Sequence, residues 1–311
     1  MPRVSANAAF AELRLDKFLC KKFDISFSLA QKLVREKKVK VNGVRVDAAY
    51  KIQDADQVEI FAELKNRYEK AERKNKISDE KMKKFSSWII FEDENLLAIN
   101  KPSGLAVQGG SGVEISVDDF ISPKNFQLVH RLDKDTSGIL LIAKNSKTAE
   151  LLTDAFKNKT ITKTYLALVA GNLKKPSGTI NIPLRKKLLG KNEKVSPDFE
   201  QGKEAITNFK LLKNFNDYAA LELSPITGRT HQLRVHCKEI GHAILNDVKY
   251  GGREVLRKNL SKRLCLHAYR IELEDYFGKK LKIETELPEF FKITPITLKP
   301  HPTDSSKSRV C

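Results

Sequence analysis

Apolar positions recur with two different periods in the first sixty residues. Leucine, phenylalanine and valine side chains repeat at helical spacing over residues 15–19 and again over 29–34, which predicts two short amphipathic helices. Residues 39–46 then alternate apolar and polar side chains around Asn42-Gly43, a dipeptide that strongly favours a two-residue hairpin turn. A further strand-like segment follows. We therefore expect a small unit of two helices and a β-hairpin.

The pattern changes twice further along the chain. Residues 63–85 are dense in Lys, Glu, Arg and Asn and predict a linker, whereas strand patterns recur after residue 86 with few helices between them. This order indicates an α+β domain at 86–300 after a small domain at 12–62, with a disordered polar tail at 301–311. The expected strands cover 88–91, 96–100, 138–144, 163–169, 205–212, 218–223 and 268–273, and the expected helices 146–157 and 229–240.

Composition and charge narrow the class of protein. The chain has 311 residues, 41% hydrophobic and 31% charged, as expected of a globular protein that buries a core. Neither an apolar run long enough for a membrane helix nor a secretory signal is present, so we expect a cytoplasmic protein without membrane contact. The net charge of +18 favours a polyanionic partner, with nucleic acid as the first candidate. Solvated surface lysines are the alternative explanation.

The densest polar cluster is the segment from His130 to Gly138. Its ionisable and hydroxyl side chains lie between two apolar segments, where they are costly to hold unless they pair with each other or with a ligand. A surface turn whose side chains cap their own backbone would account for the same residues. A second cluster spans 224–236, where His231, Arg234 and the following Lys238 fall near one face of a predicted helix and could point at a carboxylate.

Two stretches of the chain resemble known families. The pattern L-x-K-F-L followed by S-x-A-Q-K-L-V-R-E-K-K-V-x-V-N-G, at residues 15–43, is similar to the small alpha-L RNA-binding module of a ribosomal protein and many RNA-modifying enzymes. The second domain resembles the RluA-type pseudouridine synthases in H-R-L-D-x-x-T-S-G, K-T-Y-L-A-L-V-x-G and T-G-R-T-H-Q-L-R-V-H, which occur in the family's order. Within that family, K-P-S-G-x-A-V-x-G-G-S-G looks most like bacterial enzymes of large-subunit ribosomal RNA.

The resemblance implies a fold and a set of roles. The fold would be a mixed, largely antiparallel central sheet with flanking helices, preceded by the small RNA-binding domain. Asp133 would be the catalytic carboxylate, Tyr165 the ring that packs on the target base, Arg234 the partner of Asp133, and Arg131 the side chain that enters the RNA stack. Taken alone, Tyr165 would be read as a core aromatic. Whether Asp133 attacks the ribose or removes its ring proton stays open.

The implied partner is ribosomal RNA of the large subunit or an assembling ribosomal particle. We expect a monomer that uses neither a cofactor nor a metal. In the N-terminal module the cationic face expected to lie against phosphates comprises Lys17, Lys21, Lys32, Arg35, Lys37 and Lys38.

The chain departs from the family pattern at three positions. Gln108 stands where many relatives have His, and Ala243 and Asn246 replace the usual Pro and Gly, which leaves loop geometry and substrate preference open.

A metal-dependent nuclease could use the histidines and aspartates, although no recognised metal-ligand spacing occurs. A non-catalytic RNA-binding or ribosome-assembly protein would need only the charge and the first module.

Overall fold

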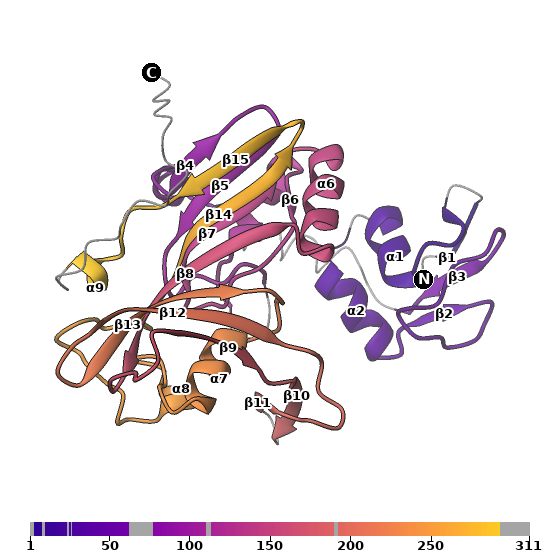
Figure 1. The fold of residues 1–311 in the computed structure, drawn as a ribbon. Helices are drawn as coiled ribbons and strands as arrows, with labels where there is room; N and C mark the ends of the chain where they lie inside the picture. Colours follow the sequence, from indigo (N-terminus) through magenta and orange to yellow (C-terminus); the bar gives the residue numbers. More distant parts are fainter. Residues whose placement is uncertain are drawn as a thin grey trace. The chain divides into compact units, whose positions relative to one another are not determined.

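The chain folds into two compact units (Figure 1). The computed structural model describes residues 3–7, 10–23, 25, 27–61, 77–109, 113–189 and 192–292. The first unit comprises Met1–Asp79 together with Gly109–Glu114, and the second comprises the remainder. The predicted tail at 301–311 and residues 63–76 of the predicted linker lie outside the described residues.

The first unit pairs two helices with a three-stranded antiparallel sheet. The apolar faces of the helices supply Phe18 and Leu33 to a core that is almost fully buried. The predicted helices are therefore confirmed here, and burial of their apolar stripe is what holds them on the sheet. The elements are α1 (Leu15–Phe23), α2 (Phe27–Arg35), β1 (Arg3–Ser5), β2 (Val39–Val41) and β3 (Gln57–Ile60), with sheet order β1-β3-β2.

The predicted hairpin is wrong in its second arm. Asn42 and Gly43 do form the turn, with φ angles of 50° and 78°, but the residues after them make only one isolated bridge. Strand β2 pairs with β3 instead. The side chain of Asn42 explains the difference, because it donates to Asp56 at 2.7 Å and accepts from the Gln57 backbone at 2.8 Å, which ties the turn to the start of β3.

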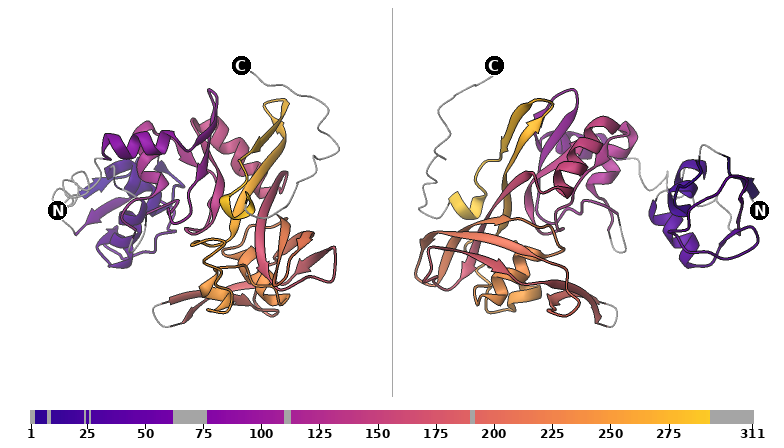
Figure 2. Two further views of the ribbon diagram at one scale, coloured as in Figure 1. Left: turned by 90° about the vertical axis from the view of Figure 1, so that its left-hand side faces the viewer. Right: turned by 45° about the vertical axis from the view of Figure 1, so that its right-hand side comes forward.

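The second unit is built on a ten-stranded sheet in the order β4-β5-β7-β14-β8-β13-β12-β9, with β15 added to β14 and β6 to β7 (Figures 1 and 2). Only β14 and β7 pair in parallel among these strands, so the predicted mixed, largely antiparallel sheet is confirmed. The strands are β4 (Ile89–Glu92), β5 (Leu96–Lys101), β6 (Gln127–Leu128), β7 (Ser137–Ala143), β8 (Ile161–Ala170), β9 (Ser177–Asn181), β12 (Ile206–Asn214), β13 (Tyr218–Pro225), β14 (Leu266–Tyr276) and β15 (Lys279–Glu284).

A separate antiparallel hairpin, β10 (Leu184–Leu189) with β11 (Asn192–Pro197), lies outside that sheet and was not predicted. Five of its twelve strand residues are charged, and its apolar residues do not alternate regularly with polar ones, so no strand was predicted here. Leu184 and Val195 nevertheless join Tyr250 in a small buried cluster, which anchors the hairpin to the rest of the unit.

Helices flank the sheet on both halves (Figure 2). Helix α6 occupies the predicted range because Asn145 caps it by accepting from the Thr148 backbone at 2.9 Å. Helix α7 begins later than predicted, since His231 has a left-handed φ of 52°. Phe85, inside the predicted linker, is buried against Phe120. The helices are α4 (Asp79–Ser86), α5 (Val117–Ile121), α6 (Ser146–Lys157), α7 (Gln232–Glu239), α8 (Val248–Gly251) and α9 (Glu289–Lys292), with a 3-10 turn at Ser122–Lys124.

The contact between β7 and β14 fixes the loop that precedes β7. Gly138 pairs with Ala268 and has a φ of 109°, and a Cβ at this position would collide with the backbone of Ala268. Only glycine meets both conditions without strain. Since β14 lies between β7 and β8, it joins the loop before β7 to the side chains of β8.

Candidate active site

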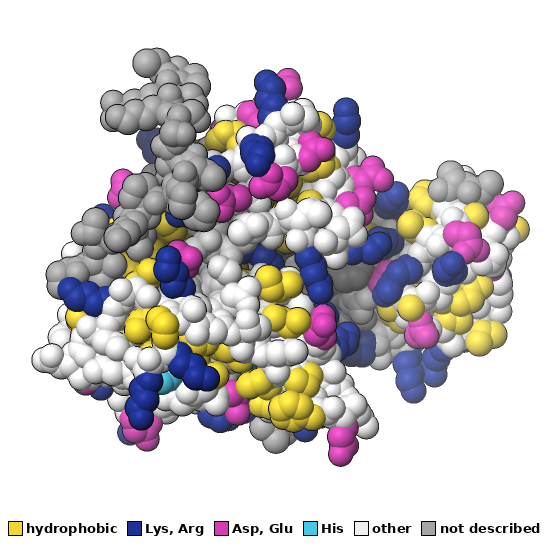
Figure 3. Space-filling view, in the orientation of Figure 1, with side chains coloured by type: hydrophobic (Ala, Val, Ile, Leu, Met, Phe, Trp, Pro, Cys, Tyr) yellow, Lys and Arg dark blue, Asp and Glu magenta, His cyan; other side chains and the backbone are white. Residues whose placement is uncertain are grey.

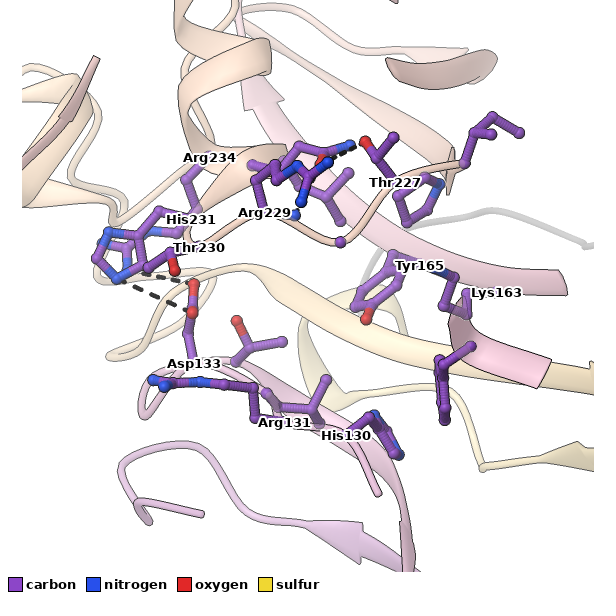
Figure 4. A pocket seen from close by; sticks show the side chains of 18 of the residues that line it. His130, Arg131, Asp133, Lys163, Tyr165, Thr227, Arg229, Thr230, His231 and Arg234 are labelled. Carbon is purple, nitrogen blue, oxygen red and sulfur yellow. Dashed lines mark hydrogen bonds and ion pairs between the residues drawn. The ribbon is translucent and has the colours of Figure 1, made fainter. Parts of the chain in front are cut away.

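A pocket of about 550 Å³ opens where the loop before β7, strand β8 and the loop between β13 and α7 converge (Figure 4). Its lining includes Arg131, Asp133, Tyr165 and Arg234. The structure therefore brings together the four side chains that were singled out in the second domain, although they come from three separate parts of the sequence.

Asp133 faces two nitrogen-bearing side chains. Its Oδ1 lies 3.9 Å from Nε2 of His231, and its Oδ2 lies 3.8 Å from Nη1 of Arg234. Both separations are longer than a direct hydrogen bond, so the lone pairs of the carboxylate stay available to a substrate in the pocket. The Asp133 side chain is 17% exposed, which makes it reachable from that side.

Arg234 has a tighter partner than the one expected from the sequence. Its Nε and Nη2 donate to the two oxygens of Asp247 at 2.8 Å and 2.7 Å, a bidentate pair in which the side chains are only 6% and 1% exposed. Burial lowers the pKa of Arg234, but the hydrogen bonds and charge of Asp247, with the charge of Asp133, raise it above its ordinary value. The guanidinium is thus a fixed positive charge held by Asp247 and presented to Asp133.

His231 is held in place by Tyr250. The hydroxyl of Tyr250 lies 2.6 Å from Nδ1 of His231 and accepts from the Val195 backbone at 3.3 Å. Because the Tyr250 oxygen accepts from Val195, its own proton can be donated to Nδ1 of His231. The proton of the neutral ring then lies on Nε2, which faces Asp133. Burial lowers the pKa of His231 against the opposing charge of Asp133, so a neutral imidazole faces the carboxylate.

Tyr165 projects from β8 into the same pocket (Figure 4). Burial raises the pKa of its hydroxyl, and the nearby charge of Asp133 acts in the same direction, so the ring stays neutral. Its neighbour Leu166 is fully buried in the hydrophobic core. The sequence left a core role open for Tyr165, and the half-buried side chain both packs against the hydrophobic core and lines the pocket.

The rim of the pocket is cationic. Arg131 and Arg229 are exposed there with Lys157 and Lys159, and half-buried Lys163 lies deeper, where burial lowers its pKa. Lys and Arg side chains are exposed on the described surface of each unit (Figure 3). A cationic rim around one carboxylate suits a polyanionic substrate that approaches with its phosphates outward.

Sequence reasoning missed the residue that supports the loop after Asp133. Lys101 is fully buried, and its Nζ donates to the Lys134 carbonyl at 3.1 Å and to two carbonyls of its own turn. Ser103 adds a 2.6 Å bond to the Asp135 carbonyl, and Gly104 donates its backbone N–H to Lys134. Burial lowers the pKa of Lys101 to about 8, which the charges of the nearby aspartates oppose. The K-P-S-G segment thus fixes the backbone that carries Asp133.

Two histidines proposed as metal ligands have structural partners instead. Nε2 of His130 accepts from the Leu141 backbone at 2.8 Å while the ring stacks on Phe156, and burial lowers the pKa of His130 to about 3. Nδ1 of His236 lies 2.9 Å from the Thr207 hydroxyl. Within the part of the chain that the structure describes, no three His, Cys, Asp or Glu side chains are arranged to hold a metal ion.

The remaining sequence candidates fall on surfaces. Lys238 was expected to share a face with His231 and Arg234, but it is exposed and pairs with Glu239 at 2.8 Å. In the first unit, Lys32 and Lys38 both pair with Glu36, at 3.6 Å and 2.7 Å. The other predicted phosphate-binding side chains, Lys17, Lys21, Arg35 and Lys37, are exposed.

Comparisons with known proteins find matches in both units. A family described as RNA pseudouridylate synthase matches residues 95–239, and the S4 domain matches residues 13–58. The chain is 40% identical to ribosomal large subunit pseudouridine synthase C of Rickettsia felis, covering 89% of this chain and 94% of the relative. The corresponding protein of Pasteurella multocida is 38% identical, over 90% of this chain and 89% of its own length.

Two solved structures share the fold over about two thirds of this chain. Human RNA pseudouridylate synthase domain containing 4 has a TM-score of 0.56 at 26% identity, covering 68% of this chain and 92% of that one. Human RNA pseudouridylate synthase domain containing 1 has a TM-score of 0.55 at 27% identity, covering 64% and 83%. The motifs that suggested the family are the segments that build the pocket, and the extent and identity of the matches are decisive: this chain belongs to the RNA pseudouridylate synthase family.

Proposed function

We propose that this protein isomerises specific uridines to pseudouridine in large-subunit ribosomal RNA, with Asp133 as the catalytic carboxylate. The observation that carries the proposal is the placement of Asp133 in one pocket with Tyr165, beside the buried cation of Arg234. Similarity over nearly the whole chain to relatives named ribosomal large subunit pseudouridine synthase C supports the choice of substrate.

The reaction exchanges one bond of the target nucleotide for another. The bond between N1 of uracil and C1′ of the ribose breaks, the base turns, and C5 bonds to C1′, while the proton on C5 is lost and N1 gains one. The uridine must first leave its stack, and Tyr165 offers a ring face for the extruded base, worth roughly 1–3 kcal/mol. Arg131, exposed at the rim, would fill the space that the base vacates.

Asp133 acts at the ribose in this scheme. It can attack C1′ as a nucleophile or remove a ribose proton as a base, and both routes need it ionised. Oδ2 of Asp133 faces the positive charge of Arg234 at 3.8 Å, and its Oδ1 faces the neutral ring of His231 at 3.9 Å. The bidentate bonds to Asp247 keep Arg234 from swinging onto the substrate phosphates.

We further propose a division of labour along the chain. Residues 12–62 would supply RNA affinity through exposed cations such as Lys17 and Lys21, and residues 86–300 would carry the chemistry. A single chain would suffice for catalysis, because every residue that lines the pocket belongs to the second unit.

Over the described residues, no helix combines the length and the apolar character needed to cross a bilayer.

The test is pseudouridine mapping of total RNA from cells that lack the protein. Complementation with wild type should restore discrete large-subunit sites, whereas Asp133→Asn should restore none, since an amide cannot act as nucleophile or base. Asp154→Asn, an exposed carboxylate on α6, should behave as wild type. If Asp133→Asn restored every site, the protein would be a non-catalytic RNA-binding factor, and loss of activity in chelator would instead favour metal chemistry.

A further inference from the structure

A second pocket, of about 490 Å³, opens on another side of Asp133. It is formed by the turn after Asp133, the segment at the start of α8 and the loop that leads into β14, and we call it the Lys262 pocket. It shares Asp133, His231 and Arg234 with the pocket that contains Tyr165. The carboxylate is therefore the boundary between the two pockets.

The walls of the Lys262 pocket carry more positive than negative charge. Four exposed cations line it. It also has three carboxylates, and the charge of one of them, Asp247, is balanced by its ion pair with Arg234. The remaining two are Asp133 and Asp135. The four cations are Lys134, Lys249, Lys262 and Arg263. This excess of positive charge favours an anionic ligand that binds near the four cations and away from the carboxylate of Asp133.

Arg263 is held in place by contacts within the protein. Nη1 of Arg263 donates to the Ser103 carbonyl at 2.8 Å. The guanidinium lies over Gly104, where a Cβ would collide with it. Fixing a guanidinium in this way leaves its other N–H groups oriented, so less conformational entropy is lost when an anion binds.

Asn246 holds the loop that carries Lys262 and Arg263. Its amide donates to the carbonyls of Ser261 at 2.9 Å and Arg263 at 3.1 Å, and its oxygen accepts from the Arg257 backbone at 2.8 Å. Its φ is 64°, a value that glycine adopts freely and asparagine tolerates. Asparagine at the position where the family pattern has glycine therefore keeps the backbone shape and adds three bonds that fix the basic end of the loop.

We propose that the Lys262 pocket binds a backbone phosphate next to the target uridine. This inference rests on the proposed function, in which the ribose lies at Asp133 and the base beside Tyr165. The phosphates of that nucleotide are attached to the ribose on carbons other than the one that carries the base, so they must extend away from Tyr165. The Lys262 pocket is the cationic space on that side of Asp133.

The first arm of the test measures binding apart from catalysis. Asp133→Asn protein is titrated with a large-subunit RNA fragment, with and without Lys262→Ala. Loss of one charge-assisted hydrogen bond should weaken Kd about tenfold. The slope of log Kd against log salt concentration should fall by about one. Lys175→Ala, an exposed lysine that lines neither pocket, should change Kd less than twofold.

The second arm changes the RNA. A methylphosphonate, neutral and similar in size, replaces single phosphates on either side of the target uridine. At one of these positions, the methylphosphonate should weaken the Kd of protein that retains Lys262 about tenfold. The Kd of the Lys262→Ala variant should not weaken further at that position. Additive losses at every position, or an unchanged Kd for Lys262→Ala, would overturn the phosphate site. Failure of wild-type protein to form pseudouridine would instead overturn the proposed function, and the Kd comparison would still decide on the pocket.

Discussion

Removing the partner of Arg234 should cost far more stability than removing an exposed partner. Asp247→Ala leaves a guanidinium that is only 6% exposed without its two hydrogen bonds, of 2.8 Å and 2.7 Å. Breaking a buried pair in this way typically costs about 3–5 kcal/mol. Asp133 remains 3.8 Å from Arg234 and compensates in part, so we expect roughly 3 kcal/mol.

The measurement is urea unfolding followed by fluorescence. Trp88 is the only tryptophan of the chain and packs against Phe85 and Phe120 in the second unit, so its signal reports unfolding of the unit that contains the pair. Glu274→Ala is the matched control, because the Lys280–Glu274 pair is as short, at 2.6 Å, but 79% and 73% exposed. It should change the free energy of unfolding by less than about 1 kcal/mol.

A double variant separates a buried unpaired charge from a simple loss of contacts. Adding Arg234→Met to Asp247→Ala removes the charge as well, and we expect at least half of the lost stability to return. The reasoning would be refuted if Asp247→Ala cost no more than Glu274→Ala, or if the double variant were less stable than Asp247→Ala alone.

Three further predictions follow from single residues. Gly138→Ala should lower the free energy of unfolding by well over 1 kcal/mol, because of its φ of 109° and backbone collision, whereas Gly228→Ala, with open space around it, should be nearly neutral in the same urea assay. Burial lowers the pKa of His267 to about 4, so stability should be full above pH 6.5 and fall by roughly 3 kcal/mol toward pH 4; His267→Gln should flatten this slope in a pH series of thermal unfolding. Tyr250→Phe frees His231 and should slow single-turnover conversion roughly tenfold at unchanged RNA affinity; an unchanged rate would rule out positioning by Tyr250.

Local patterns predicted the parts of the fold that depend on local chemistry. Helix α6 has an apolar stripe and a capping asparagine, and both lie within its own sequence. Strand order could not be predicted, because β14 enters the sheet between β7 and β8 although it lies about a hundred residues further along the chain. The truncated hairpin at Asn42 shows the same limit, since its turn residues were correct and its partner strand was decided by contacts with Asp56 and Gln57.

The sequence predicted which residues share the pocket, but not the bonds that they make. Motif resemblance selected Asp133, Tyr165 and Arg234, which do line one pocket. It did not reveal that Asp247 is the bonded partner of Arg234, because spacing along the chain does not say which carboxylate a loop will bring near. Lys101 was missed for a different reason: a lysine at the end of a strand is expected to be exposed, and only the three carbonyls around Nζ show why it is buried.

The place of β14 in the sheet also sets when the enzyme can first work during its own synthesis. Asp133 precedes β7 and Tyr165 lies on β8, and both are translated long before residues 266–276, which form the strand that joins them. A nascent chain that has passed Arg234 already contains every proposed catalytic group, yet its sheet lacks a central member. We therefore expect catalysis only after β14 has emerged and inserted between β7 and β8.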